Sequence, residues 1–101
     1  MVKHIVMFNF LPEAEGRTKK ENAAIAAEML SELQGKIPSL LKSEVHLNSD
    51  SADQSNFDLV LVSEHEDWNG LREYAVHPLH VKVGEFIKKV RESRSCVDYE
   101  F

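Results

Sequence analysis

The stretch K-H-I-V-M-F-N-F-L at residues 3–11 decides most of the fold. It is rich in isoleucine, valine, methionine and phenylalanine and is bounded by turn-forming residues, which predicts a β-strand. Side chains alternate across a strand, so one face carries His4, Val6, Phe8 and Phe10, and the other carries Ile5, Met7 and Leu11. Both faces of this strand are therefore apolar.

The rest of the chain supplies helices and strands in a simple order. A polar linker over residues 12–17 leads to the capping box Thr18–Glu21, which starts a helix that runs to about Gln34, before Gly35. Further strands are predicted over residues 42–48, 57–65 and 95–101, and a second helix over residues 68–93, capped by Asp67 or Glu66. The polar run 48–56 suits a connection between antiparallel strands.

The order βαββαβ predicts an α+β, ferredoxin-like fold, in which two helices cover one face of a four-stranded antiparallel sheet. The 101 residues suit a single domain over residues 1–101. The strand at 57–65 is also apolar on both faces, with Leu59 and Leu61 opposite Val60 and Val62. Leaving one such face in water forgoes about 25 cal/mol per Å² of apolar surface. We therefore expect a homodimer whose two sheets pack face to face.

Composition narrows the class of partner. The net charge of −5 argues against nucleic acid and anionic membranes. Six of the twelve basic residues stand among acids, as on solvated helix faces (Lys19, Lys20, Lys88, Lys89, Arg91 and Arg94). The single cysteine, Cys96, excludes an intramolecular disulfide and fits a cytoplasmic protein. The short apolar run near the N-terminus predicts neither a signal peptide nor a membrane anchor.

The segment Y-A-V-H-P-L-H at residues 74–80 interrupts the last helix. A residue before proline is disfavoured in the α region, so His77 should leave helical geometry and cap the next segment, with Pro78 at its first position. These two residues are therefore expected to be structural. The break would fold Tyr74 and His80 towards one cavity, where Gly84 leaves space. A neutral imidazole at His80 could then accept a proton.

The other histidines receive different interpretations. His46 and His65 are expected at the surface, the latter because Glu64 and Glu66 flank it. His4 shares a face with core residues and is interpreted either as a core-edge histidine bonded to a backbone carbonyl or as a third wall of the site. Two histidines three apart, His77 and His80, also suggest a metal site, but no further ligand motif accompanies them. We expect no metal and no cofactor.

Three segments together resemble a known family, the stress-responsive α/β-barrel (Dabb) domain: V-K-H-I-V-M-F-N-F, Y-A-V-H-P-L-H-V-K-V and V-D-Y-E-F. The resemblance covers essentially the whole chain and implies a dimer of ferredoxin-like sheets that forms a barrel. The family includes olivetolic acid cyclase, a polyketide cyclase that uses a tyrosine and a histidine in aldol condensation. The resemblance implies that His80 withdraws a proton next to a carbonyl, Tyr74 holds the oxyanion and His4 orients the site.

The first helix differs from that of the cyclase. The cyclase lines its pocket with aromatic residues from the first helix, where this chain has A-A-I-A-A at residues 23–27. The broader superfamily also includes cofactor-free monooxygenases. Three functions therefore stay open: a binder of a hydrophobic small molecule, a cofactor-independent cyclase-like enzyme, and a purely structural module. A cavity that reaches Tyr74 and His80 favours the first two, whereas tight packing around them favours the third. The expected lining is Val6, Phe8, Leu59, Leu61 and Ile87.

Overall fold

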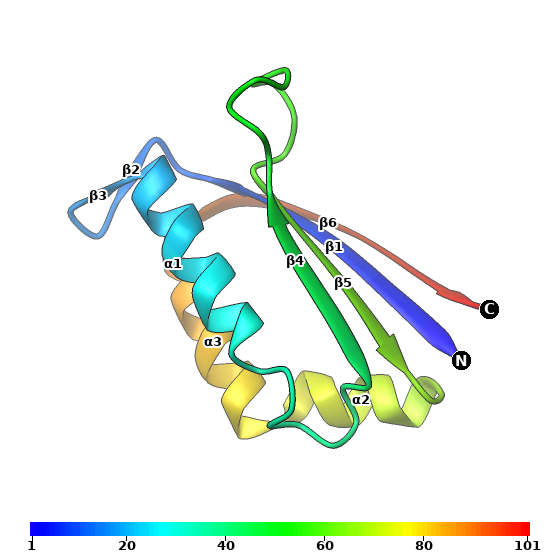
Figure 1. The fold of residues 1–101 in the computed structure, drawn as a ribbon. Helices are drawn as coiled ribbons and strands as arrows, with labels where there is room; N and C mark the ends of the chain where they lie inside the picture. Colours follow the sequence, from blue (N-terminus) through cyan, green and yellow to red (C-terminus); the bar gives the residue numbers. More distant parts are fainter.

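A computed structural model describes residues 1–101, and its main sheet is built on the first strand. The strands β1 (Val2–Phe10), β4 (Lys42–Leu47), β5 (Leu59–His65) and β6 (Arg91–Glu100) form an antiparallel sheet in the order β4-β5-β1-β6. The helices α1 (Lys19–Ser31), α2 (Trp68–Val76) and α3 (Pro78–Val90) lie on one side of it (Figure 1). The predicted ferredoxin-like fold is confirmed.

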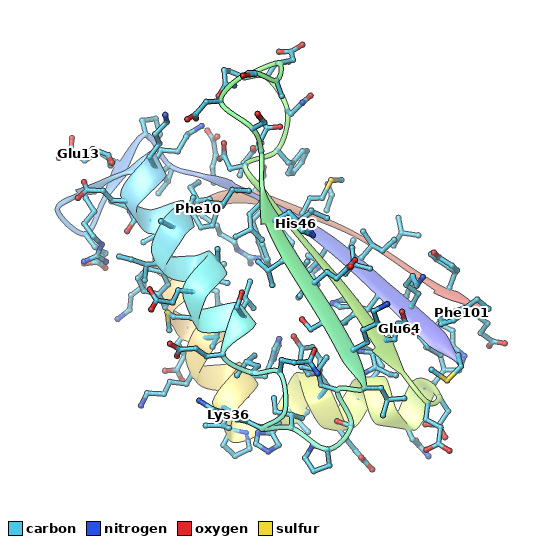
Figure 2. The ribbon with its side chains drawn as sticks, viewed as in Figure 1. Phe10, Glu13, Lys36, His46, Glu64 and Phe101 are labelled. Atoms are coloured by element: carbon cyan, nitrogen blue, oxygen red, sulfur yellow. The ribbon has the colours of Figure 1, made fainter.

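The alternation of β1 sets the two faces of the sheet. Its even-numbered side chains are buried against the helices, and Phe10 lies wholly buried beside α1 (Figure 2). The same face of β5 contributes Leu59 and Leu61 to this core. The opposite face is covered by no helix and carries Met7, Val97 and Tyr99, which are exposed by 36%, 62% and 41%. The expectation that helices cover only one apolar face is therefore met.

Local sequence signals begin and break the helices. The Thr18–Glu21 capping box is present at the start of α1. Asp67, not Glu66, caps α2 by accepting a hydrogen bond from the Gly70 N–H at 2.8 Å. His77 is extended (φ −62°, ψ 134°) and its Nδ1 accepts from the Leu79 N–H, while Pro78 opens α3. His77 and Pro78 therefore make the helix break, as predicted.

Several predicted boundaries were wrong. α1 ends at Ser31 rather than near Gln34, and the linker 12–17 contains a small hairpin, β2 (Glu13–Ala14) and β3 (Arg17–Thr18). The largest error is at the last strand, which begins at Arg91 directly after α3. It does so because β1 offers pairing partners as far as Phe10, which is opposite Arg91. None of the helices is both long and apolar enough to cross a membrane.

Candidate functional site

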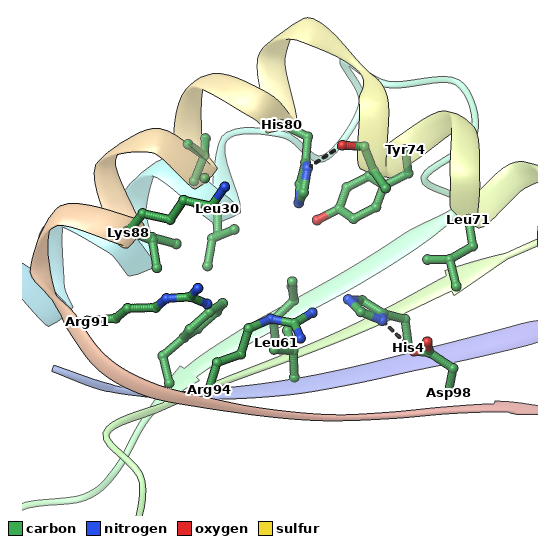
Figure 3. Close-up of a pocket in the computed structure, with 16 residues that line it drawn as sticks. His4, Leu30, Leu61, Leu71, Tyr74, His80, Lys88, Arg91, Arg94 and Asp98 are labelled. Carbon is green, nitrogen blue, oxygen red and sulfur yellow. Dashed lines mark hydrogen bonds and ion pairs between the residues drawn. The ribbon is translucent and has the colours of Figure 1, made fainter.

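A cavity of about 340 Å³ lies between the helices and the sheet. All three predicted catalytic residues, Tyr74, His80 and His4, line it (Figure 3). Four of the five residues expected in the lining are there, whereas Leu59 is buried in the core and does not reach it. The full lining is His4, Val6, Phe8, Leu30, Leu61, Leu71, Tyr74, Ala75, His80, Val83, Gly84, Ile87, Lys88, Arg91, Arg94 and Asp98.

The first helix contributes little to this cavity. Only Leu30 comes from α1, and none of the residues 23–27 lines the space. Ala23 and Ala26 are instead buried in the core. The small side chains of A-A-I-A-A therefore let α1 pack closely, and the cavity is bounded mainly by α2, α3, β1 and β6.

The helix break brings Tyr74 and His80 into contact. Tyr74 is on the last turns of α2 and His80 on the first turn of α3, and their ring centroids are 4.4 Å apart. A straight helix would place residues six apart on different sides. The extended backbone of His77 removes that separation.

The proton on His80 can be assigned from its hydrogen bond. Its Nδ1 lies 3.1 Å from the Ala75 carbonyl oxygen, which can only accept, so Nδ1 carries the hydrogen. The other ring nitrogen, Nε2, points into the cavity (Figure 3). Burial lowers the pKa of His80, the Ala75 carbonyl opposes this, and the charges of His4 and Arg94 lower it further. At neutral pH the cavity therefore contains a free imidazole lone pair.

Tyr74 supplies the complementary group. It is almost fully buried, with 1% of its surface exposed, and burial raises its pKa to about 12. The phenol therefore stays protonated at any physiological pH and can donate a hydrogen bond. Its hydroxyl points into the same cavity as the His80 ring (Figure 3). A proton acceptor and a proton donor thus face one space of molecular size.

His4 is hydrogen-bonded to a carboxylate. The interpretation of His4 as a core-edge histidine bonded to a backbone carbonyl was therefore wrong about its partner. Its Nδ1 is 2.5 Å from Oδ1 of Asp98, the residue opposite it on β6. Cys96 Sγ lies 3.4 Å from the same oxygen. Burial raises the pKa of Cys96, as does Asp98, while Arg94 acts in the opposite direction. The carboxylate fixes the orientation of the His4 ring at the cavity wall.

His4, Cys96 and Asp98 are the one set of three potential metal-ligand atoms within 4.8 Å of each other. His4 Nδ1 and Cys96 Sγ both lie within hydrogen-bonding distance of Asp98 Oδ1. The set is thus well described as a hydrogen-bonded cluster. His77 and His80 belong to no such set. The Nδ1 of His77 accepts from the Leu79 N–H, and the Nδ1 of His80 is bonded to the Ala75 carbonyl oxygen.

The prediction that His65 lies at the surface was wrong. Its side chain is fully buried, with Nδ1 2.8 Å from the Ser39 carbonyl oxygen and Nε2 2.9 Å from Ser63 Oγ. Its ring centroid is 5.0 Å from that of Tyr74. Period-two alternation contains the missed signal, because His65 shares a face of β5 with Leu59 and Leu61. His65 thus packs against the Tyr74 ring but does not line the cavity. His46 is exposed, as expected.

The basic residues of the cavity were also missed. Arg91 and Arg94 were expected on a solvated helix face, but both are on β6 and line the cavity with Lys88. In β6 the apolar and polar faces are reversed relative to those of β1. Its positions opposite the buried side of β1 are mostly charged (Arg94, Asp98 and Glu100), while Val97 and Tyr99 face the open side of the sheet. This inversion gives the cavity a polar margin.

The chain is similar to one protein family and to several solved structures. The model of the Stress responsive A/B Barrel Domain family matches residues 2–101. A dimeric protein of unknown function and ferredoxin-like fold from Bacteroides fragilis is 34% identical, with a TM-score of 0.81 over 99% of this chain and 95% of that one. No curated protein matches.

More distant structures share the fold alone. A putative antibiotic biosynthesis monooxygenase from Nitrosomonas europaea is 16% identical over 100% of this chain and 98% of that one, with a TM-score of 0.78. A hydroxynitrile lyase from Passiflora edulis is 12% identical over 97% and 90%, with a TM-score of 0.74. One fold thus carries different chemistries, so function must be argued from the site. By its family match over residues 2–101, the chain belongs to the stress-responsive A/B barrel domain family.

Proposed function

We propose that this protein binds a hydrophobic small molecule in the cavity between its sheet and helices. One observation carries the proposal: the cavity of about 340 Å³ combines an apolar wall with two groups of opposite hydrogen-bonding character, Tyr74 and His80. Cavities of about 300–1,000 Å³ with a few convergent polar groups are typical of small-molecule sites. A purely structural role for the two residues gives no reason for the open space beside them.

A second candidate, catalysis of a cyclase type, is favoured by the orientation of His80. Its Nδ1–H is held by the Ala75 carbonyl, so Nε2 can take a proton from a carbon next to a bound carbonyl. The Tyr74 phenol, with its pKa of about 12, would donate to the oxygen on which charge develops. His4, held by Asp98, would position the ligand from the opposite wall. No cofactor is required for this proton transfer.

Binding and catalysis are separated by deuterium exchange into 4-phenylbutan-2-one, a simple ketone with exchangeable α-hydrogens. Binding is measured by saturation-transfer NMR, and exchange in D₂O by loss of the α-proton signal. If the cyclase-type candidate holds, His80→Ala lowers exchange by about 10²-fold or more and Tyr74→Phe by about 10-fold or more, with binding retained. His46→Gln is the matched control, because it removes an exposed histidine outside the cavity.

The outcomes are distinct. Binding without accelerated exchange supports the binder and removes the catalytic candidate for ketones. Exchange that survives His80→Ala removes His80 as the base. Absence of binding by this ketone and by charged and neutral naphthalene derivatives would sink the proposal as a whole.

The proposal includes assembly as a homodimer through the open face of the sheet, and a cytoplasmic location. Ile5, Met7, Val60, Val62 and Val97 present apolar side chains there with no helix above them. Burying this patch against a second copy removes its contact with water, which is the main driving force of such association. The Bacteroides fragilis relative is described as dimeric, which supports assembly as a dimer.

A further inference from the structure

We propose that the ligand of this cavity is a hydrophobic carboxylic acid in its ionised form, whose carboxylate is held by Arg91 and Arg94 with Lys88 beside them. The inference rests on the proposed function. It adds the chemical class of the ligand and the orientation of the ligand in the cavity.

A β-bulge brings the two arginines to the same side of the sheet. Residues three apart on a regular strand point to opposite faces. In β6 the register shifts between Asn9 and Phe10 of β1, so that Arg91 is opposite Phe10 and Arg94 is opposite Phe8. Both partners are buried on the helix side of the sheet. The extra residue in β6 therefore directs two guanidinium groups to the cavity instead of one.

These cations have no counter-ion in the fold. The ion pairs of the chain are formed by Lys3, His4, Lys19 and Lys20, and none involves Lys88, Arg91 or Arg94. Three cations and one carboxylate, Asp98, line the cavity, and that carboxylate is already bonded to His4. The lining is therefore positive in a chain whose net charge is −5. Such a local reversal of sign attracts anions to the opening.

An ordinary structural role explains only part of the cluster. Lys88 is in the last turn of α3, where a cation interacts favourably with the helix dipole. Arg94 is beyond the helix, in a strand position opposite Phe8, and its exposed side chain lines the cavity, so the helix dipole does not account for it. A guanidinium matches a carboxylate through two parallel hydrogen bonds, which makes arginine well suited to this ligand.

The polar groups of the cavity lie along its length. Figure 3 shows Lys88 and Arg91 on one side and Tyr74, His80 and His4 on the other, with the Arg94 guanidinium beside Leu61 between them. A bound acid would therefore place its carboxylate at the arginines and its apolar body along Leu61 and Ile87. Its far end would meet His80 and Tyr74. The carboxylate would thus serve for recognition and would not be the group that meets the histidine.

The test uses three probes that share one ring system and differ in charge: 2-naphthoate, 2-naphthalenemethanol and 2-naphthylmethylammonium. Fluorescence titration at low ionic strength should give an affinity for naphthoate about tenfold or more above that for the alcohol, and weakest binding for the ammonium. Arg94→Gln should remove most of that preference and leave the alcohol unchanged. Lys89→Gln, the same loss of charge outside the cavity lining, should leave both affinities unchanged.

Arg91→Gln and a salt titration of the unmodified protein provide independent readouts if Arg94→Gln folds poorly. The preference for naphthoate should fall in both. Equal binding of naphthoate and the alcohol by the unmodified protein would overturn the inference but leave the proposed function in place. Loss of the preference in Lys89→Gln to the same extent as in Arg94→Gln would overturn it too, because net charge alone would then explain the effect. Failure of all three probes to bind would overturn the inference, and it would remove the proposed function as well only if 4-phenylbutan-2-one also failed to bind.

Discussion

Tyr74 and His80 are six residues apart in the sequence, yet their ring centroids are 4.4 Å apart with an interplanar angle of 49°. The contact exists because the backbone leaves helical geometry at His77 and resumes it at Pro78. His65 extends the cluster behind Tyr74, and His4 faces it with a ring centroid 6.4 Å away. The helix break is thus the element that assembles the site.

Filling the cavity from Gly84 should weaken ligand binding without unfolding the protein. A Cβ at this helical position meets no heavy atom within 4 Å. Gly84→Ala should therefore stabilise the fold by about 0.5–1 kcal/mol, because alanine is the better helix former. Gly84→Leu should project into the cavity and weaken naphthoate binding by about tenfold or more. Thermal unfolding and fluorescence titration of both variants check this, and unchanged binding by Gly84→Leu would contradict the assigned cavity.

A charge on the open face of the sheet should dissociate the proposed dimer. Val97 is 62% exposed on that face, and an aspartate there would bring two carboxylates into one apolar interface. Val97→Asp should sediment as a monomer at concentrations where the unmodified protein is a dimer. Val76→Asp is the matched control, since Val76 is 73% exposed on α2, on the helix side. A monomeric unmodified protein would contradict the assembly itself.

Removing Asp98 should destabilise the fold through His4. Asp98→Ala leaves a largely buried imidazole nitrogen without its partner, for which we expect a loss of about 1–2 kcal/mol in the free energy of unfolding at pH 7. Asp98→Asn keeps a hydrogen-bond acceptor, so its free energy of unfolding should fall by less. In the control Asp50→Ala, the broken pair with Lys20 is largely exposed, so the loss should stay below about 0.5 kcal/mol. Urea denaturation measures all three, and equal losses in Asp98→Ala and Asp50→Ala would argue against a structural role for the bond.

The buried His65 and the half-buried His80 should make stability depend on pH. Burial is the main cause that lowers the pKa of both His65 and His80 from the ordinary value of 6.5. As the pH falls below 6.5, the unfolded chain takes up protons before the folded one. The free energy of unfolding should therefore be highest above pH 6.5 and decline as the pH falls through the lowered pKa values.

The groups that act on these two rings are His4, Arg94 and Asp98, and His65 also acts on His80. Urea denaturation between pH 5 and pH 7.5 measures the decline, and His80→Leu should reduce its slope because one of the two groups is removed. Two carboxyl groups, Glu21 and Asp53, have lowered pKa values and therefore titrate below the range of pH 5 to pH 7.5. A free energy of unfolding that rises as the pH falls from 6.5 to 5 would contradict the neutral state of both histidines.

Much of the fold was predictable because its signals are local. The alternation of residues 3–11, the Thr18–Glu21 capping box and the His77–Pro78 break each depend on a few neighbouring residues, and all three are present in the structure. The start of β6 was not predictable in this way. Residues 91–94 follow a helix without a turn signal, and their strand conformation comes from pairing with β1, more than 80 positions earlier in the chain.

The sequence by itself determined the order of elements, the two faces of β1 and the helix break that directs Tyr74 and His80 towards each other. These follow from backbone preferences and from the period of the apolar side chains. Only the tertiary structure decided the partner of His4, the burial of His65 and the position of Arg91 and Arg94 at the cavity. Each of these depends on strand register or on a bulge, and a shift of one residue in register turns a side chain to the other face. Local sequence does not contain that information, because register is set by the strands that pair.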